Sequence, residues 1–212
     1  MLYDKDIREP LFDFLETRYD KVRVIEEKQM GRSRADIVMV LEEALIGIEI
    51  KSDADTYTRL KRQVKDYDQY FDANYVVVGT SHAMHIEEHV PDWWGIITVE
   101  EEDGGADFYV LRQARENPQV NWEKKLGLLW RPELAQIQAK NMLPRYPGRS
   151  KPFVVQKILE RVPLEILRTQ VSDVLFERDY QEIGRVIAEF RDKNTAARTR
   201  RKSASKRRRR TK

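Results

Sequence analysis

Two carboxylates and one lysine lie close together in the stretch between residues 31 and 51. Asp36 opens one apolar run, and Glu49 and Lys51 end a second one. If the two runs form an antiparallel hairpin that turns near residues 42–43, Asp36 pairs with Glu49, with their Cβ atoms about 5 Å apart. Side chains alternate along a strand, so Lys51 shares the face of Glu49. The sequence therefore predicts two carboxylates and an ammonium group at one end of one hairpin face.

The opposite face of this predicted hairpin is wholly apolar. It carries six residues: Ile37, Met39, Leu41, Ile46, Ile48 and Ile50. Solvated hairpin faces often hold a cross-strand Glu–Lys pair, so spacing alone leaves a structural interpretation open. Gly47 on the polar face favours a functional interpretation, because a missing side chain leaves room for a ligand.

Two carboxylates this close repel each other, and burying them beside an apolar sheet is costly without compensation. A divalent cation supplies that compensation, and carboxylate oxygens suit Mg²⁺ or Mn²⁺. Such a metal activates a water and neutralises charge on a scissile phosphate. Lys51 would then stabilise negative charge at the same place. The residue types thus predict metal-dependent phosphodiester hydrolysis.

Composition narrows the remaining classes of site. The chain has no cysteine, which excludes disulfides, iron–sulfur clusters and thiol nucleophiles. Its three histidines fall in one short segment, residues 82–89, where a zinc site would still need further ligands. No apolar run approaches the roughly 20 residues that cross a bilayer. The acidic N-terminus is unlike a signal peptide. We therefore expect a soluble, cytoplasmic protein.

The formal charge of +3 hides a division along the chain. Residues 198–212 hold ten Lys or Arg and no acid, which leaves 29 basic against 36 acidic residues elsewhere, about −7. This segment is low in complexity and has no apolar anchor, so we expect residues 194–212 to be a disordered basic tail. It suits a non-specific DNA tether, a solubility segment or, in a eukaryotic setting, a nuclear import signal.

The apolar periodicity predicts an α/β (α+β) fold with a central mixed β-sheet flanked by helices. The expected strands are 22–27, 36–41, 45–51, 75–79, 95–99 and 107–112. The expected helices are 4–18, 56–71, 121–141, 152–161, 164–177 and 180–193. Pro10 favours a start of the first helix near Arg8 or Glu9. We expect a core at residues 1–118 and a helical C-terminal region at 119–193.

These residues resemble a known family. Asp36, followed after twelve residues by Glu49-Ile50-Lys51, resembles the signature of the PD-(D/E)xK phosphodiesterase superfamily. Residues 63–67 read QxxxY and resemble a further motif of its RecB and lambda-exonuclease branch. Residues 4–140 are similar to a phage- and prophage-associated group of small members. Ala35 departs from the family proline. The resemblance implies a restriction-endonuclease-like core in a bacterial or phage-encoded protein.

The resemblance also implies roles for single residues. Asp36, Glu49 and Lys51 would be catalytic. The metal ligands would be Glu9, Asp36, Glu49 and the carbonyl of Ile50. Gln63 and Tyr67 would contact the DNA backbone or brace the site. Arg32 and Arg34 precede Asp36 and could contact phosphate, although solvated loop charges explain them equally well.

The resulting hypothesis is a Mg²⁺- or Mn²⁺-dependent deoxyribonuclease. QxxxY favours exonuclease, repair or recombination activity by analogy alone. One alternative is a non-catalytic DNA-binding protein that keeps the nuclease fold, and another is a protein that binds a partner through its helical region. Because many members of the superfamily work as dimers or rings, the resemblance also allows a homo-oligomer. The Trp93-Trp94 pair suits either base stacking or the core.

Overall fold

The computed structural model describes residues 2–19, 21–102 and 105–178. The strands are β1 Arg23–Met30, β2 Ser33–Val40, β3 Leu45–Lys51, β4 Ala73–Gly79, β5 Gly95–Glu102 and β6 Gly105–Arg112. The helices are α1 Asp4–Arg18, η1 Tyr57–Arg59, α2 Leu60–Tyr70, α3 Thr80–Ala83, η2 Ile86–Glu88, α4 Trp122–Gly127, α5 Arg131–Lys140, α6 Lys151–Leu159 and α7 Leu164–Phe176.

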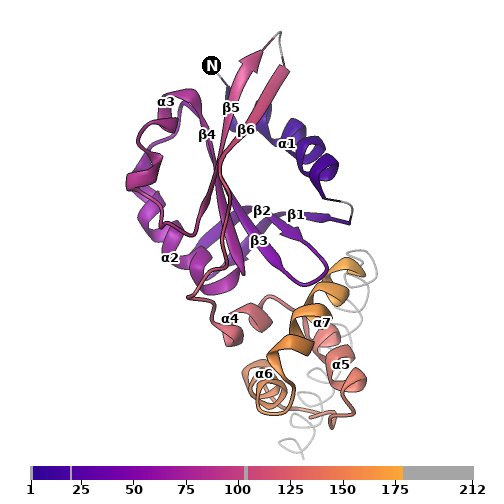
Figure 1. The fold of residues 1–212 in the computed structure, drawn as a ribbon. Helices are drawn as coiled ribbons and strands as arrows, with labels where there is room; N and C mark the ends of the chain where they lie inside the picture. Colours follow the sequence, from indigo (N-terminus) through magenta and orange to yellow (C-terminus); the bar gives the residue numbers. More distant parts are fainter. Residues whose placement is uncertain (1, 20, 103–104, 179–212) are drawn as a thin grey trace, which may run out of the picture. The chain divides into compact units, whose positions relative to one another are not determined.

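The six strands form one mixed sheet in the order β1-β2-β3-β4-β5-β6 (Figure 1). Strands β1, β2 and β3 are antiparallel, β3, β4 and β5 are parallel, and β6 returns antiparallel to β5. The parallel step from β3 to β4 requires a crossover, which α2 provides. The predicted α/β fold, with a mixed sheet, flanking helices and a helical C-terminal region, is confirmed.

The β2–β3 hairpin has the predicted register. Val40 pairs with Leu45 and Ile37 with Ile48. The next position along this register sets Asp36 opposite Glu49. The alternation of the two strands therefore controls which side chains meet at the open end of the hairpin.

The sheet separates two hydrophobic layers, with α1 on one face and α2 on the other (Figure 1). On the α1 face, Ile7, Leu11 and Leu15 are buried with the apolar hairpin side chains. On the α2 face, sheet residues share one continuous core with buried residues of α4 to α7. The predicted apolar and polar faces of the hairpin are thus covered by different helices.

Helix α2 approaches β3 most closely at Gly47. A Cβ atom added there would lie 2.6 Å from Tyr67 Cδ1 and 2.3 Å from Phe71 Cδ2. The expectation that Gly47 leaves room for a ligand is therefore wrong, because two aromatic rings of α2 fill the space. Gly47 instead lets Tyr67 reach the carboxylates at the end of the hairpin.

Helix α1 begins at Asp4, earlier than Pro10 predicted. Pro10 lies inside the helix, where it cannot donate to the carbonyl of Asp6. The Asp6 carboxylate accepts a hydrogen bond from Tyr3 N–H (3.0 Å), as in the returning half of a capping box. This contact and the buried face of the helix outweigh the local effect of proline.

The predicted helix 121–141 is two helices, α4 and α5. The helix is interrupted at residues 128–130. Pro132 lies in the first turn of α5, a position that proline favours. The break allows α4 to pack on α2 and on α6.

Met1–Phe176 forms one compact unit, and the second unit, Glu177–Lys212, lies outside the described residues except for its first two. The predicted helix 180–193 and the tail 194–212 fall in this undescribed part. Among the helices that the structure describes, none is long and apolar enough to cross a membrane.

Candidate active site

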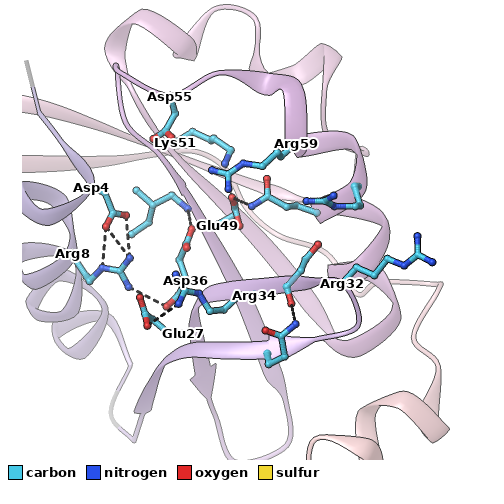
Figure 2. Close-up of a pocket in the computed structure, with 15 residues that line it drawn as sticks. Asp4, Arg8, Glu27, Arg32, Arg34, Asp36, Glu49, Lys51, Asp55 and Arg59 are labelled. Atoms are coloured by element: carbon cyan, nitrogen blue, oxygen red, sulfur yellow. Dashed lines mark hydrogen bonds and ion pairs between the residues drawn. The ribbon is translucent and has the colours of Figure 1, made fainter.

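The open end of the β2–β3 hairpin lies in a pocket of about 390 Å³ (Figure 2). Its walls come from α1, β1, the β1–β2 turn, β2, β3, η1 and the start of α2. The lining residues are Asp4, Arg8, Glu27, Gln29, Arg32, Ser33, Arg34, Asp36, Glu49, Ile50, Lys51, Asp55, Arg59, Arg62 and Gln63. Of the residues predicted from the sequence, the structure brings seven to this pocket and leaves out Glu9 and Tyr67.

Glu49 is fully buried, and three side chains hold its carboxylate. Lys51 Nζ lies 2.5 Å from Oε1, and Gln63 Nε2 donates to the same oxygen. The Tyr67 hydroxyl donates to Oε2 at 2.8 Å. An ionised carboxylate accepts about four hydrogen bonds, so Glu49 keeps little more than one lone pair for another ligand.

The backbone of Asp36 is held by side chains rather than by neighbouring strands. Asp36 N–H donates to the Tyr67 hydroxyl (3.2 Å), and its C=O accepts from Arg8 Nη1 (3.3 Å). On β1, the register sets Glu27 across from Asp36, and Glu27 adopts a φ of +51°. Left-handed backbone is costly for a residue other than glycine and gathers at functional sites. The regular ladder is thus interrupted at Asp36.

Few groups stabilise the negative charge of the Asp36 carboxylate. Its Oδ2 accepts from Ile50 N–H at 2.9 Å. Burial, followed by the negative charge of Glu49, raises the pKa of Asp36 to about 7, while Ile50 N–H and Lys51 act in the opposite direction. Near neutral pH this carboxyl therefore exchanges a proton readily, and a nearby cation would keep it ionised.

Tyr67 braces the Glu49 carboxylate and the backbone of Asp36. It is wholly buried, and its one hydroxyl proton can go to Glu49 Oε2 (2.8 Å) or to the carbonyl of Ile48 (3.1 Å). Burial and the charge of Glu49 raise the pKa of Tyr67, so the phenol stays protonated. Of the two roles that the resemblance implies for Tyr67, the geometry favours bracing over contact with DNA.

Gln63 lines the pocket, and only the nitrogen of its side-chain amide forms a hydrogen bond with a described residue. Its Nε2 donates to Glu49, whereas its Oε1 is buried and has no hydrogen-bond partner among the described residues. A buried amide oxygen without a partner costs roughly 1–3 kcal/mol. A cation or a metal-bound water would satisfy it.

The available oxygens suit Mg²⁺ or Mn²⁺. Within residues 2–178, apart from the gaps given above, no three His, Cys, Asp or Glu side chains form a cluster that could hold a metal. The oxygens here come instead from two carboxylates, the Gln63 amide and the backbone. Because Ile50 N–H points toward β2 and an extended residue directs its C=O the same way, the Ile50 carbonyl lies on the Asp36 side of β3. Mg²⁺ completes such partial sets with water.

Glu9 is exposed on α1 and is not brought to the pocket. Asp4 and Arg8 line it instead, and Arg8 Nη2 donates to Asp4 Oδ2 at 2.8 Å. Residues four apart share a helix face, whereas Glu9 is rotated by about 100° from Arg8. The early start of α1 thus places Asp4 where the sequence suggested Glu9.

The pocket rim is more basic than the sequence suggested. Arg34 pairs with Glu27 (3.1 Å), whereas Arg32 forms no ion pair with another described residue. Arg59 and Arg62 also line the pocket and were not anticipated. Arg59 lies four residues before Gln63, so extending the four-residue spacing of QxxxY toward the N-terminus would have found it.

Two other groups that the sequence analysis raised, the Trp93-Trp94 pair and the histidines of residues 82–89, make contacts within the fold. The indole N–H groups of Trp93 and Trp94 both donate to Asp68 Oδ1, at 3.2 and 2.8 Å. Trp94 is fully buried in the core, and Trp93 is partly buried against it. The ring of Tyr57 packs against His82 and His89, with centroid distances of 4.8 and 4.2 Å.

Comparison with known proteins gives one family match. The family model described as Bacteriophage P4 protein cII matches residues 2–201. No curated protein matches the sequence. A solved structure titled "The structure of Pyrococcus Furiosus SfsA in complex with Ca2+" is 16% identical, with a TM-score of 0.30. That match covers 56% of this chain and 62% of the SfsA chain, so this chain spans less than two thirds of that protein.

Proposed function

This chain belongs to the bacteriophage P4 protein cII family, and we propose that it is a Mg²⁺- or Mn²⁺-dependent nuclease that hydrolyses phosphodiester bonds in DNA. The observation that carries the proposal is the end of the β2–β3 hairpin. There Asp36 lies opposite Glu49 beside Lys51, burial and the charge of Glu49 raise the pKa of Asp36 to about 7, and Gln63 Oε1 has no hydrogen-bond partner among the described residues. The resemblance to PD-(D/E)xK enzymes assigns the same three residues to catalysis. The family description supports a phage setting, and the resemblance to PD-(D/E)xK enzymes supports a role in DNA processing there.

Three groups would hold the metal: the Asp36 carboxylate, the Glu49 carboxylate and the Ile50 carbonyl. When bound, the metal would activate a water and neutralise charge on the scissile phosphate. Gln63 Oε1 would then orient a water beside it, which would satisfy the buried amide. Asp4, rather than Glu9, is the acid on α1 that reaches the pocket.

Lys51 would change partner during the reaction. In the structure its ammonium lies 2.5 Å from Glu49 Oε1 and is almost fully buried. A divalent cation on Glu49 would weaken that ion pair by competing for the same oxygen. The ammonium would then be available to hold the attacking water or a phosphate oxygen, where it stabilises developing negative charge.

The test is metal-dependent cleavage of linear, circular, nicked and branched DNA. We expect Glu49→Ala and Lys51→Ala each to lower the rate by roughly 10²–10³-fold or more. Lys61→Ala is the matched control, because Lys61 is exposed on α2 and does not line the pocket. Calorimetry should show that Mg²⁺ or Mn²⁺ binds the native chain and not Asp36→Asn.

Undiminished cleavage by Glu49→Ala would refute the assignment. A chain that binds DNA but neither binds metal nor cleaves would be the non-catalytic binding protein that the sequence left open. The tether role of residues 194–212, the three-part division of the chain and a homo-oligomer remain predictions.

A further inference from the structure

Three arginines at the pocket rim have uncompensated charge. Arg32, Arg59 and Arg62 are exposed, and within the part of the chain that the structure describes none of them forms an ion pair. The other two rim arginines differ. Arg8 is paired with Asp4 and Arg34 with Glu27. The free guanidinium groups therefore mark where the rim can accept an anion.

These free arginines lie on two separate walls. Arg59 ends η1 and Arg62 lies in the first turn of α2, three residues further on, so both emerge on one side of the helix. Arg32 belongs to the turn between β1 and β2. Figure 2 shows Arg59 reaching toward Glu49, whereas the side chain of Arg32 extends away from Asp36 and Glu49 at the outer edge of the pocket that both arginines line.

The turn that carries Arg32 is fastened to α2. Ser33 Oγ donates to Asp66 Oδ2 at 2.5 Å. The preceding Gly31 has a φ of +54°, and a Cβ atom there would lie 3.3 Å from Asp66 Oδ1. The two walls therefore keep a fixed spacing, which favours an extended ligand of defined width over an adaptable surface contact.

Access to the carboxylates limits what can enter. Glu49 and Lys51 are almost completely buried, so a reacting phosphate must descend into the pocket. The pocket volume of about 390 Å³ is at the low end of the range for small-molecule sites, roughly 300–1,000 Å³. This space suits one or two nucleotides of a single strand better than a base-paired duplex.

We propose that this pocket takes one strand of DNA, and that Arg59 and Arg62 on one wall and Arg32 on the other bind the phosphates flanking the scissile one. The inference rests on the proposed nuclease function and names its substrate class: single-stranded DNA or an unpaired end or flap. Arg34 takes no part, because Glu27 already neutralises it.

The test measures binding without catalysis. In EDTA, anisotropy would follow a labelled single strand of about 15 nucleotides and its blunt duplex at several salt concentrations. The variant is Arg59→Gln with Arg62→Gln. The matched control is Lys61→Gln with Lys65→Gln, which removes the same charge from exposed positions of α2 outside the pocket. The basic residues 198–212 are the same in all variants, so their contribution cancels.

We expect the arginine variant to reduce the salt dependence for the single strand by about 0.7 per lost contact, or about 1.4 in all. The duplex should lose less. Arg32→Gln, on the opposite wall, should change the single-strand slope in the same direction by about 0.7. Thermal unfolding would verify that every variant is folded.

Equal losses in the arginine and lysine variants, or a larger loss for the duplex, would overturn the inference. Neither outcome depends on metal or cleavage, so this test can fail while the Glu49→Ala test succeeds. Conversely, a normal arginine effect in a chain that never cleaves DNA would retain the strand-binding pocket and reject the nuclease.

Discussion

Two lysines are buried against carboxylates in this protein, and they serve different ends. Lys51 lies 2.5 Å from Glu49 at the open end of the hairpin. Lys125 of α4 lies 2.6 Å from both oxygens of Asp72, and the Leu45 N–H donates to Asp72 Oδ2 at 2.7 Å. Both pairs are almost inaccessible to solvent. Geometry and burial alone therefore do not distinguish a structural ion pair from a reactive one.

The charges around each pair do distinguish them. Asp72 has two cations nearby, since Arg168 also acts electrostatically on Lys125 and Asp72. Glu49 shares its single buried cation with a second carboxylate, Asp36, whose pKa is raised. The Asp72 pair fastens α4 to the start of β3, and it is balanced. The Glu49 pair is short of one positive charge, which is the deficiency that a divalent cation would correct.

The largest contrast should come from removing each lysine in turn. We expect Lys125→Met to lower the free energy of unfolding by about 3–5 kcal/mol, because it leaves Asp72 buried without its lysine. Lys51→Met should cost less, since Gln63 and Tyr67 still donate to Glu49. Urea denaturation with and without Mg²⁺ would measure both.

Mg²⁺ should stabilise Lys125→Met only as much as it stabilises the native chain, because that variant keeps the proposed metal ligands. It should stabilise the Lys51→Met protein more, because only this substitution removes positive charge from beside those ligands. The two variants control for each other, since each loses one buried lysine. Equal rescue by Mg²⁺ would remove the distinction between the pairs.

The next largest effect is a pH dependence of stability that comes from Asp36, beside the Glu49–Lys51 pair. Because the folded-state pKa of Asp36 is about 7, above its ordinary value of 3.8, the metal-free protein should lose stability as pH rises from about 4 to 7. The loss should be on the order of 3 kcal/mol. Asp36→Asn, which cannot ionise, should flatten this part of the profile, and Mg²⁺ should reduce it in the native chain. A pH profile unchanged by Asp36→Asn would contradict the raised pKa.

The hairpin shows how far sequence reasoning extends. Its register was predictable because a tight turn near residues 42–43 leaves one pairing, which sets Ile37 opposite Ile48. That register alone set Asp36 opposite Glu49. The order of helix, strands and crossover followed from local periodicity in the same way.

Other features depend on contacts between distant segments. The role of Gly47 was missed because nothing near it in sequence shows that α2 packs against its Cα. Asp4 was missed because Pro10 suggested a later start for α1. The free charges of Arg59 and Arg62 were missed because pairing at a rim is decided by neighbours from other elements. Each miss comes from tertiary packing that overrides a local preference.

The smallest expected effect tests whether the Tyr67 hydroxyl positions Glu49 and Asp36. Tyr67→Phe removes a hydroxyl that donates to Glu49 and accepts from Asp36 N–H, so we expect a loss of about 1–2 kcal/mol in unfolding free energy. Cleavage should fall as well, because the Glu49 carboxylate and the backbone of Asp36 each lose a hydrogen bond that positions them. Tyr57→Phe is the control, since that hydroxyl donates only to the carbonyl of His82, away from the carboxylates.

DNA binding in EDTA should be unchanged in Tyr67→Phe, because the ring is wholly buried and cannot touch a strand. This result would separate the brace from the arginines of the rim, whose removal should weaken binding directly. Weaker binding in Tyr67→Phe with normal metal affinity would mean that the α2 wall itself had moved. Glu49 would then be held mainly by Lys51, as Asp72 is held by Lys125, and the two buried pairs would differ only in the charge of Asp36.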